Sequence, residues 1–495
     1  MLFNSLDYAV FLIFTLLFYW LLALKPALRI PRLLFVLFAS CIFYMAWNPW
    51  YIFLILFSTT VDWFVARKIA LHEEGPQRKR WLFVSLILNL TLLGTFKYFD
   101  FLGHVFADGA SLFGLVIEPP SLAKVFNRLR ALFGWDPIRE VILPVGISFY
   151  TFESLSYCID VYRKKCEPAR TPLELLLFIT FFPKLVAGPI ARPAELFPQV
   201  RKEPYLDKEQ IGKALHLIVT GLIKKVAFAD YVSINLVDRV FDAPDQYTAP
   251  EVVVALYGFT LQIYMDFSGY TDIARGSAKL FGIELPENFD RPYQASNPAE
   301  FWRRWHMTLS TWLRDYLYFP LGGSKLGEAR TYFNLWITIF LIGLWHGANW
   351  TFVIYGAIQA SFVVIHRIFV QVSKKKNTPP SQDPAWLRVL KVLGTLQLVV
   401  FSRILFRAND LGEAKAVFFR IFSGTSGLAN VAPTVWVALL LGFALHYTPR
   451  SWYSWSERSF VKLPGVVQGA LLFVIFAILN RIASSETVPY VYFQF

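Results

Sequence analysis

Two histidines stand inside long aromatic and apolar motifs, where polar side chains are uncommon. His306 lies in FWRRWHMTLSTWLRDYLYFPLGG (residues 301–323), and His346 lies in GLWHGANWTF (residues 343–352). An unperturbed imidazole has a pKa of about 6.5, so a neutral ring can accept a proton from a hydroxyl group near neutral pH. The two motifs therefore predict proton-transfer chemistry in an apolar setting.

His346 closes the apolar run 332–345, and Gly347 with Asn349 lets the chain change direction directly after it. A polar side chain at such a depth in a membrane is costly and usually faces a cavity or a partner. We therefore interpret His346 as a functional residue and Asn349 as a substrate-binding neighbour. A core histidine satisfied by a backbone carbonyl is the structural alternative.

Residues 301–317 have the periodicity of one helix that lies in the membrane interface. The apolar face of that helix comprises Phe301, Trp302, Trp305, Leu309, Trp312, Leu313 and Tyr316. The polar face comprises Arg303, Arg304, Thr311, Arg314 and Asp315. At about 100° per residue, His306 falls at the margin of the apolar face and can point into the bundle. Spacing alone favours a hydrogen-bonded structural role for His306.

Further polar side chains interrupt the apolar runs, and most of them are expected to pair with one another. They are Lys97, Lys184, Asp266, Asp272, Arg403 and Arg481. Gln262 and Asp266 stand one helical turn apart in QIYMDFSGYTDIARG (residues 262–276). They either line a water-filled path, together with Trp345, or lie in a helix contact made through small residues.

Several kinds of catalytic motif are absent from the sequence. It has no phosphate-binding glycine loop, no HExxH and no GxSxG elbow. The three cysteines are scattered, which predicts neither a disulfide framework nor a thiolate metal site. His216, His366 and His446 also lie in apolar runs, but nothing pairs them as haem ligands and structural roles are expected. We expect no metal and no bound cofactor.

The composition is that of an all-α membrane protein. Of 495 residues, 56% are hydrophobic and only 17% are charged, and the mean hydropathy is +0.45. These values lie outside the usual range of soluble domains. The net charge of +13 is spread over many short loops, which predicts basic cytoplasmic loops and not a nucleic-acid partner.

The alternation of basic and non-basic loops predicts the topology. By the positive-inside rule the N-terminus is outside. A full crossing at 173–190 would then put Arg192 and Arg201 outside, so we expect this proline-containing segment to be re-entrant. About twelve full spans accompany it, which leaves the C-terminus outside as well. A flexible cytoplasmic linker is expected near 372–385, within a single domain that covers 1–495.

Several long motifs follow one another along the chain. They are LPVGISFYTFESLSYCIDVYR (143–163), FFPKLVAGPIARP (181–193), QIYMDFSGYTDIARG (262–276), LPENFDRPY (285–293), the two histidine motifs and the terminal YVYFQF. With these motifs in this order, the chain resembles the membrane-bound O-acyltransferase family, and within it the bacterial alginate O-acetylation branch. The resemblance implies a bundle of membrane helices around a central tunnel.

The resemblance also implies roles for individual residues. His346 would be catalytic and would take the proton from an acceptor hydroxyl as it attacks the thioester of acetyl-CoA. His306 would be the second catalytic residue. The donor would approach from the cytoplasmic side, and the substrate-binding residues expected there are Arg303, Arg304, Trp305 and Arg314.

The resemblance further implies an inner-membrane enzyme that passes acetyl groups to an extracytoplasmic acetyltransferase or acyl-carrying protein, and so to a secreted polysaccharide. Within the family, the D-alanyl transferases of teichoic acid synthesis are the alternative because they share the histidine motifs. A polar-lined channel or transporter is the alternative from another class, since a broken segment and buried charges are typical of transporters.

Overall fold

The computed structural model describes residues 1–373, 383–483 and 488–491, and every regular element in these residues is a helix. The all-α class is therefore confirmed. The predicted linker near 372–385 lies largely outside the described residues, as do the last four residues of the terminal YVYFQF motif.

The helices of the N-terminal part are α1 (Leu6–Ala23), α2 (Arg29–Met45), α3 (Tyr51–Leu71), α4 (Pro76–Leu93), α5 (Phe99–Ser111), α6 (Leu122–Leu132), α7 (Ile147–Tyr162), α8 (Pro172–Thr180) and α9 (Pro193–Arg201). The middle part contains α10 (Lys208–Leu222), α11 (Asp238–Asp242), α12 (Ala249–Leu280), α13 (Pro298–Arg304), α14 (Met307–Leu313), α15 (Glu328–His346) and α16 (Trp350–Val372). The C-terminal part contains α17 (Ala385–Arg407), α18 (Leu411–Arg420), α19 (Pro433–Tyr447), α20 (Arg450–Lys462) and α21 (Gly465–Ile482).

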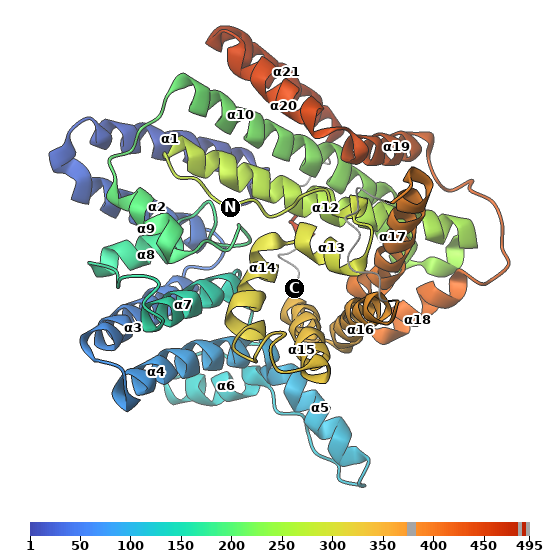
Figure 1. Ribbon diagram of the computed structural model, residues 1–495, viewed down its shortest axis with the longest axis horizontal. Coiled ribbons are helices and arrows are strands. Elements are labelled where there is room, and N and C mark those ends of the chain that lie inside the picture. The colour runs from blue at the N-terminus through green and yellow to red at the C-terminus, as the bar shows by residue number, and fades with distance from the viewer. Residues whose placement is uncertain (374–382, 484–487, 492–495) are drawn as a thin grey trace.

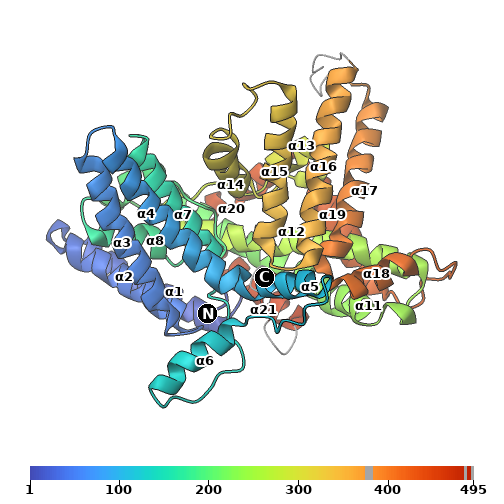
Figure 2. The same cartoon turned by 90° about the horizontal axis from the view of Figure 1, so that it is seen from below.

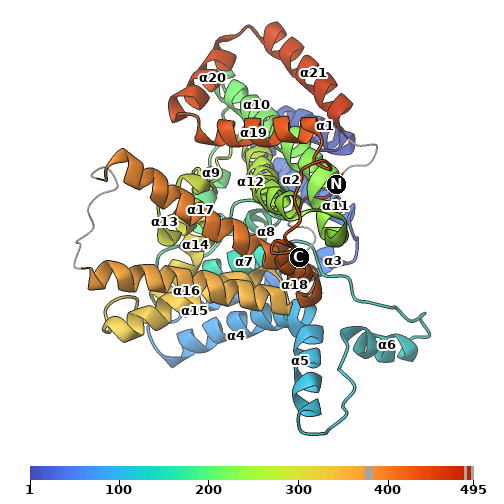
Figure 3. The same cartoon turned by 90° about the vertical axis from the view of Figure 1, so that its right-hand side faces the viewer.

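Helix α12 forms the centre of the molecule. It has 32 residues, and 83% of the residues in its most apolar 18-residue stretch are buried. It packs along α10, with α1 to α4 on one side of the molecule and α15 to α17 on the other (Figure 1). Figure 2 shows α15, α16 and α17 side by side, and Figure 3 shows α19 to α21 beside α10.

Seven helical segments in the described residues are long and apolar enough to cross a membrane. They are Leu6–Ala23, Pro26–Met45, Pro76–Ser111, Ala249–Leu280, Trp350–Val372, Ala385–Arg407 and Gly465–Ile482. Most of these helices expose large apolar side chains on their outer surfaces, as lipid-facing helices do.

The segment predicted to be re-entrant is broken as expected. Helix α8 ends at Thr180, and residues 181–192 are non-helical before α9 begins. The Nε of Arg201, at the end of α9, lies 2.5 Å from Oε1 of Glu174, in the first turn of α8. The start of α8 and the end of α9 therefore lie together.

The prediction of one continuous helix over 301–317 is wrong. Helix α13 ends at Arg304, and α14 begins only after His306, whose backbone is left-handed with φ of 43°. The break has a tertiary cause, because Met307 N donates to Asn288 O over 2.9 Å and Asp290 N donates to Arg304 O over 2.9 Å. A strand-like contact from residues 288–290 thus replaces helical hydrogen bonds. The predicted apolar face is nevertheless buried from Phe301 to Leu313.

Candidate active site at the two buried histidines

His346 is the last residue of α15, as the sequence predicts. Its side chain is 2% exposed, and its ring centroid lies 5.0 Å from that of Trp345 and 5.0 Å from that of Phe406. It lines a cavity of about 220 Å³, the His346 cavity, together with Trp345, Phe149 and Lys97. The imidazole is therefore held by aromatic side chains and forms part of a cavity wall.

A close crossing of two helices sets the position of His346. A Cβ added to Gly343 would lie 2.4 Å from the Cα of Gly356, so only glycine permits α15 and α16 to approach this closely. Gly343 lies one turn before His346 in the same helix. Gly343, the first glycine of the GLWHG motif, thus fixes the position of the His346 imidazole.

The end of α15 is held from the π-helical turn Gly94–Tyr98, which follows α4. Lys97 Nζ donates to Trp345 O over 2.6 Å and to His346 O over 3.1 Å. Tyr98 Oη donates to Leu344 O over 2.9 Å. These three carbonyls belong to the last turn of α15, where carbonyl groups have no helical N–H partner. The π-helical turn Gly94–Tyr98 supplies their donors and so fixes the end of α15.

His306 is fully buried at the break between α13 and α14. Its Nδ1 lies 3.2 Å from Asn288 Oδ1. That atom also accepts the backbone N–H of Thr308 over 3.2 Å, which identifies it as the amide oxygen. His306 Nδ1 must therefore carry a proton, and in the neutral ring Nε2 is the acceptor.

The two histidines flank one indole. The centroid of the Trp345 ring lies 5.6 Å from His306 and 5.0 Å from His346. Phe149 contacts the same group, with its centroid 6.2 Å from His306 and 5.2 Å from Trp345. The structure thus brings together the two histidines and the tunnel candidate Trp345.

A second, larger cavity of about 540 Å³ adjoins the His346 cavity and shares Lys97 and Leu143 with it. We call it the acidic cavity because Asp230, Asp238, Asp242 and Asp266 line it. Its volume lies within the range of ligand pockets, about 300–1,000 Å³. The predicted residues Gln262, Asp266 and Asn349 all line its wall.

Three of the four aspartates in the acidic cavity are in ion pairs. Lys225 Nζ lies 2.8 Å from Asp266 Oδ1 and 2.7 Å from Asp230 Oδ1. Arg407 Nη2 lies 2.8 Å from Asp238 Oδ1. Asn349 is also structural, since its Oδ1 caps α16 by accepting from Thr351 N over 3.0 Å.

The other predicted substrate-binding residues lie apart from both cavities. Arg303 and Arg314 are exposed, and Trp305 is 1% exposed beneath the guanidinium of Arg403, 4.7 Å from its ring centroid. Arg304 takes part in a structural network, with Nη2 2.7 Å from Glu300 Oε1.

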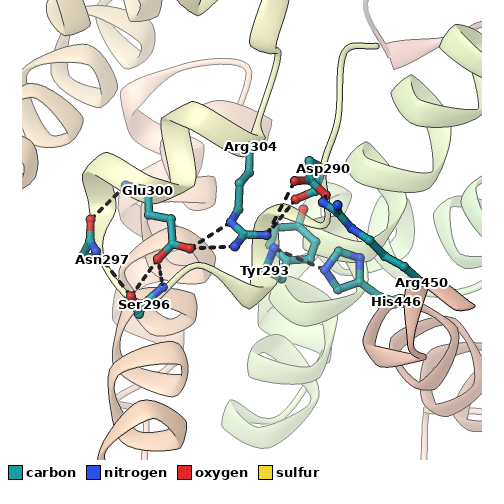
Figure 4. Close-up of polar contacts among 8 residues, drawn as sticks. All are labelled: Asp290, Tyr293, Ser296, Asn297, Glu300, Arg304, His446 and Arg450. Carbon is teal, nitrogen blue, oxygen red and sulfur yellow. Dashed lines mark hydrogen bonds and ion pairs between the residues drawn. The ribbon is translucent and has the colours of Figure 1, made fainter. Parts of the chain in front are cut away.

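This network anchors α13 and hence the break that contains His306 (Figure 4). Arg304 and Arg450 both pair with Asp290. Tyr293 N donates to Nε2 of His446 over 3.2 Å, which gives His446 the structural role expected for it.

The six residues do not pair with one another as expected, but three of them form ion pairs with residues outside the set. Lys184 pairs with Glu153, Asp266 with Lys225, and Asp272 with Lys224. Arg481 is exposed, whereas Lys97 donates to the backbone carbonyl of Trp345 and Arg403 Nη1 donates to Tyr355 Oη over 3.5 Å.

Asn288 and Lys97 are the site residues that the sequence did not identify as such. Asn288 stands in the LPENFDRPY motif but looks like an ordinary loop residue, and Lys97 is remote from His346 in sequence. No local pattern pairs either residue with a histidine.

Comparisons with known proteins show the family of the chain. Residues 169–394 match the model of MBOAT, the membrane-bound O-acyltransferase family. The protein named "Probable alginate O-acetylase AlgI" in Pseudomonas syringae pv. tomato is 37% identical over 79% of this chain and 70% of the relative. The chain belongs to the membrane-bound O-acyltransferase family. It is therefore a multi-pass membrane enzyme that transfers an acyl group to a hydroxyl oxygen.

Two other relatives differ in the substrates that their names state. The peptidoglycan O-acetyltransferase of Helicobacter pylori is 34% identical over 81% of this chain and 75% of the relative. The teichoic acid D-alanyltransferase of Bacillus subtilis is 30% identical over 59% of this chain and 75% of the relative. The O-acetylating relatives thus match more of the chain.

Proposed function

We propose that the enzyme takes an acetyl group from cytoplasmic acetyl-CoA and moves it across the bacterial inner membrane for O-acetylation of a secreted, alginate-like polysaccharide. The observation that carries the proposal is the pair of buried imidazoles on either side of Trp345, one of which, His346, lines a cavity. The names of relatives at 37% and 34% identity support acetyl as the acyl group. D-alanyl transfer has weaker support because that relative matches less of the chain.

His346 is the general base of the proposed reaction. Its neutral ring takes the proton of the acceptor hydroxyl while the hydroxyl oxygen bonds to the acyl carbon. The carbon–sulfur bond then breaks, and the thiol of coenzyme A leaves with a proton. His306, oriented by Asn288, is the second catalytic residue and positions the thioester.

The proposed topology puts the donor and the acceptor on opposite faces. About twelve spans and the re-entrant α8–α9 segment form one domain, 1–495, with both termini outside. The donor enters a central tunnel from the cytoplasmic side, where the exposed Arg303 and Arg314 attract its phosphates. The acceptor arrives through the acidic cavity. An extracytoplasmic acetyltransferase or acyl-carrying protein then passes the acetyl group to the polysaccharide.

The test measures ester-linked acetate on the exported glycan in cells that carry His346→Ala. The matched control is His104→Ala, because His104 is an exposed histidine of α5. With equal amounts of each protein in the membrane, we expect acetate to be lost only in His346→Ala. Full acetate in His346→Ala refutes the catalytic assignment. Solute flux that persists in this variant without thioester consumption supports the transporter alternative instead.

A further inference from the structure

Lys97 is a charged side chain that lines both cavities of the site. It belongs to the π-helical turn Gly94–Tyr98, directly after α4, and it is part of the wall of the acidic cavity and of the His346 cavity. A π-helical turn inserts an extra residue into a helix and is frequent at functional sites. The turn therefore puts an ammonium group at the junction of the two spaces.

The donors of Lys97 are only partly used. An ammonium group has three N–H donors, and two of them go to Trp345 O at 2.6 Å and His346 O at 3.1 Å. Both acceptors are backbone carbonyls on the residues that carry the indole and the imidazole. These bonds hold the ammonium group beside the catalytic imidazole and leave one donor for a ligand in the cavities.

We propose that Lys97 donates this third N–H to the acyl carbonyl oxygen during transfer. The inference rests on the proposed acyltransferase function. As the acceptor oxygen bonds to the acyl carbon, the carbonyl electrons move to its oxygen, and Lys97 stabilises that oxyanion. The carbonyl re-forms when the carbon–sulfur bond breaks, and the thiol leaves with the proton that His346 removed from the acceptor. Lys97 is thus a catalytic residue as well as a cap of α15.

A charged donor suits this task because apolar side chains form much of the wall around it. The Lys97 ammonium lies 5.7 Å from the centroid of Trp345, and Phe149, Leu143 and Val186 provide apolar wall around the same cavity. In a water-poor site, a fixed donor stabilises developing charge far more than it does in water, and removal of one oxyanion donor lowers kcat by about 100-fold to 1,000-fold.

The experiment compares Lys97→Met and Lys97→Gln with Tyr98→Phe. Tyr98→Phe removes a hydrogen bond to the same helix end, from Tyr98 Oη to Leu344 O, but leaves the ammonium in place. Activity is measured as acetyl-CoA consumption per molecule of folded membrane protein. We expect kcat to fall about 100-fold or more in Lys97→Met, with little change in KM. Tyr98→Phe is expected to lose less than about tenfold.

Lys97→Gln keeps N–H donors for the carbonyls but removes the charge, so it tests the proposal even if Lys97→Met fails to fold. A large loss of kcat in Lys97→Gln supports the oxyanion role. A change in KM alone, or equal losses in Lys97→Gln and Tyr98→Phe, overturns it and leaves Lys97 as a cap. If the wild-type enzyme shows no His346-dependent consumption of the thioester, the proposed function itself fails, which is a distinct result.

Discussion

The buried ion pair between Lys184 and Glu153 offers a quantitative test of how the broken segment after α8 is held. The side chains are 0% and 4% exposed. Glu153 Oε1 also accepts from Ala191 N over 3.2 Å, so that one carboxylate binds two points of the non-helical stretch 181–192. In Lys184→Met, the carboxylate stays buried with a single N–H donor, and breaking such a pair costs about 3–5 kcal/mol.

The double variant Lys184→Met with Glu153→Met removes both charges and leaves only the N–H of Ala191 without its acceptor. That loss amounts to about 1–3 kcal/mol, so the double variant is expected to be more stable than Lys184→Met alone. The assay is reversible unfolding in mixed detergent micelles, followed by tryptophan fluorescence. Lys164→Met is the control, because the Lys164–Glu74 pair is 62% and 81% exposed and should contribute nothing measurable.

The reasoning is refuted if the double variant loses the sum of the two single losses, since independent residues add. It is also refuted if Lys184→Met unfolds like Lys164→Met.

Two further predictions concern the histidines. Gly343→Ala forces a Cβ to within 2.4 Å of Gly356 Cα and should lower both transfer activity and stability, the latter by about 1–3 kcal/mol, whereas Gly394→Ala meets nothing within 4 Å and should be neutral in thermal unfolding. Asn288→Leu removes the acceptor that fixes the His306 ring and its tautomer, so kcat should fall at least about tenfold while the protein level in the membrane is kept. Full activity in either Gly343→Ala or Asn288→Leu would contradict the positions assigned to the two histidines.

Hydropathy is a reliable guide to much of this fold because a helix in lipid must satisfy its own backbone. The run 332–345 predicts α15 and its end at His346, and the glycine that follows ends the helix as expected. The prolines of the segment after α8 likewise predict its break, since they cannot donate helical hydrogen bonds.

The break at His306 lay beyond sequence periodicity. Residues 301–317 have a helical pattern, but the helix is interrupted. Asn288 O accepts from Met307 N, and Asp290 N donates to Arg304 O, in place of helical hydrogen bonds. Such contacts join segments that no local pattern connects. The role of Lys97 could not be predicted for the same reason. Its partners are backbone carbonyls of α15, which no sequence motif reveals.

The assignment of Arg304 and Trp305 to substrate binding came from their places in the motif. In the structure, Arg304 forms ion pairs with Glu300 and Asp290, and Trp305 is buried beneath the guanidinium of Arg403. These contacts support the fold, and substrate binding by Arg304 and Trp305 stays a prediction.

In the proposed function, His346 drives transfer of an acetyl group from one face of the membrane to the other. Inverted membrane vesicles that contain the enzyme, its extracytoplasmic partner protein and the glycan acceptor are given radiolabelled acetyl-CoA on the exposed cytoplasmic face. We predict that hydroxylamine-labile label accumulates in the vesicle lumen with wild-type enzyme and with His104→Ala, and that none accumulates with His346→Ala. Equal accumulation with His346→Ala would contradict the account.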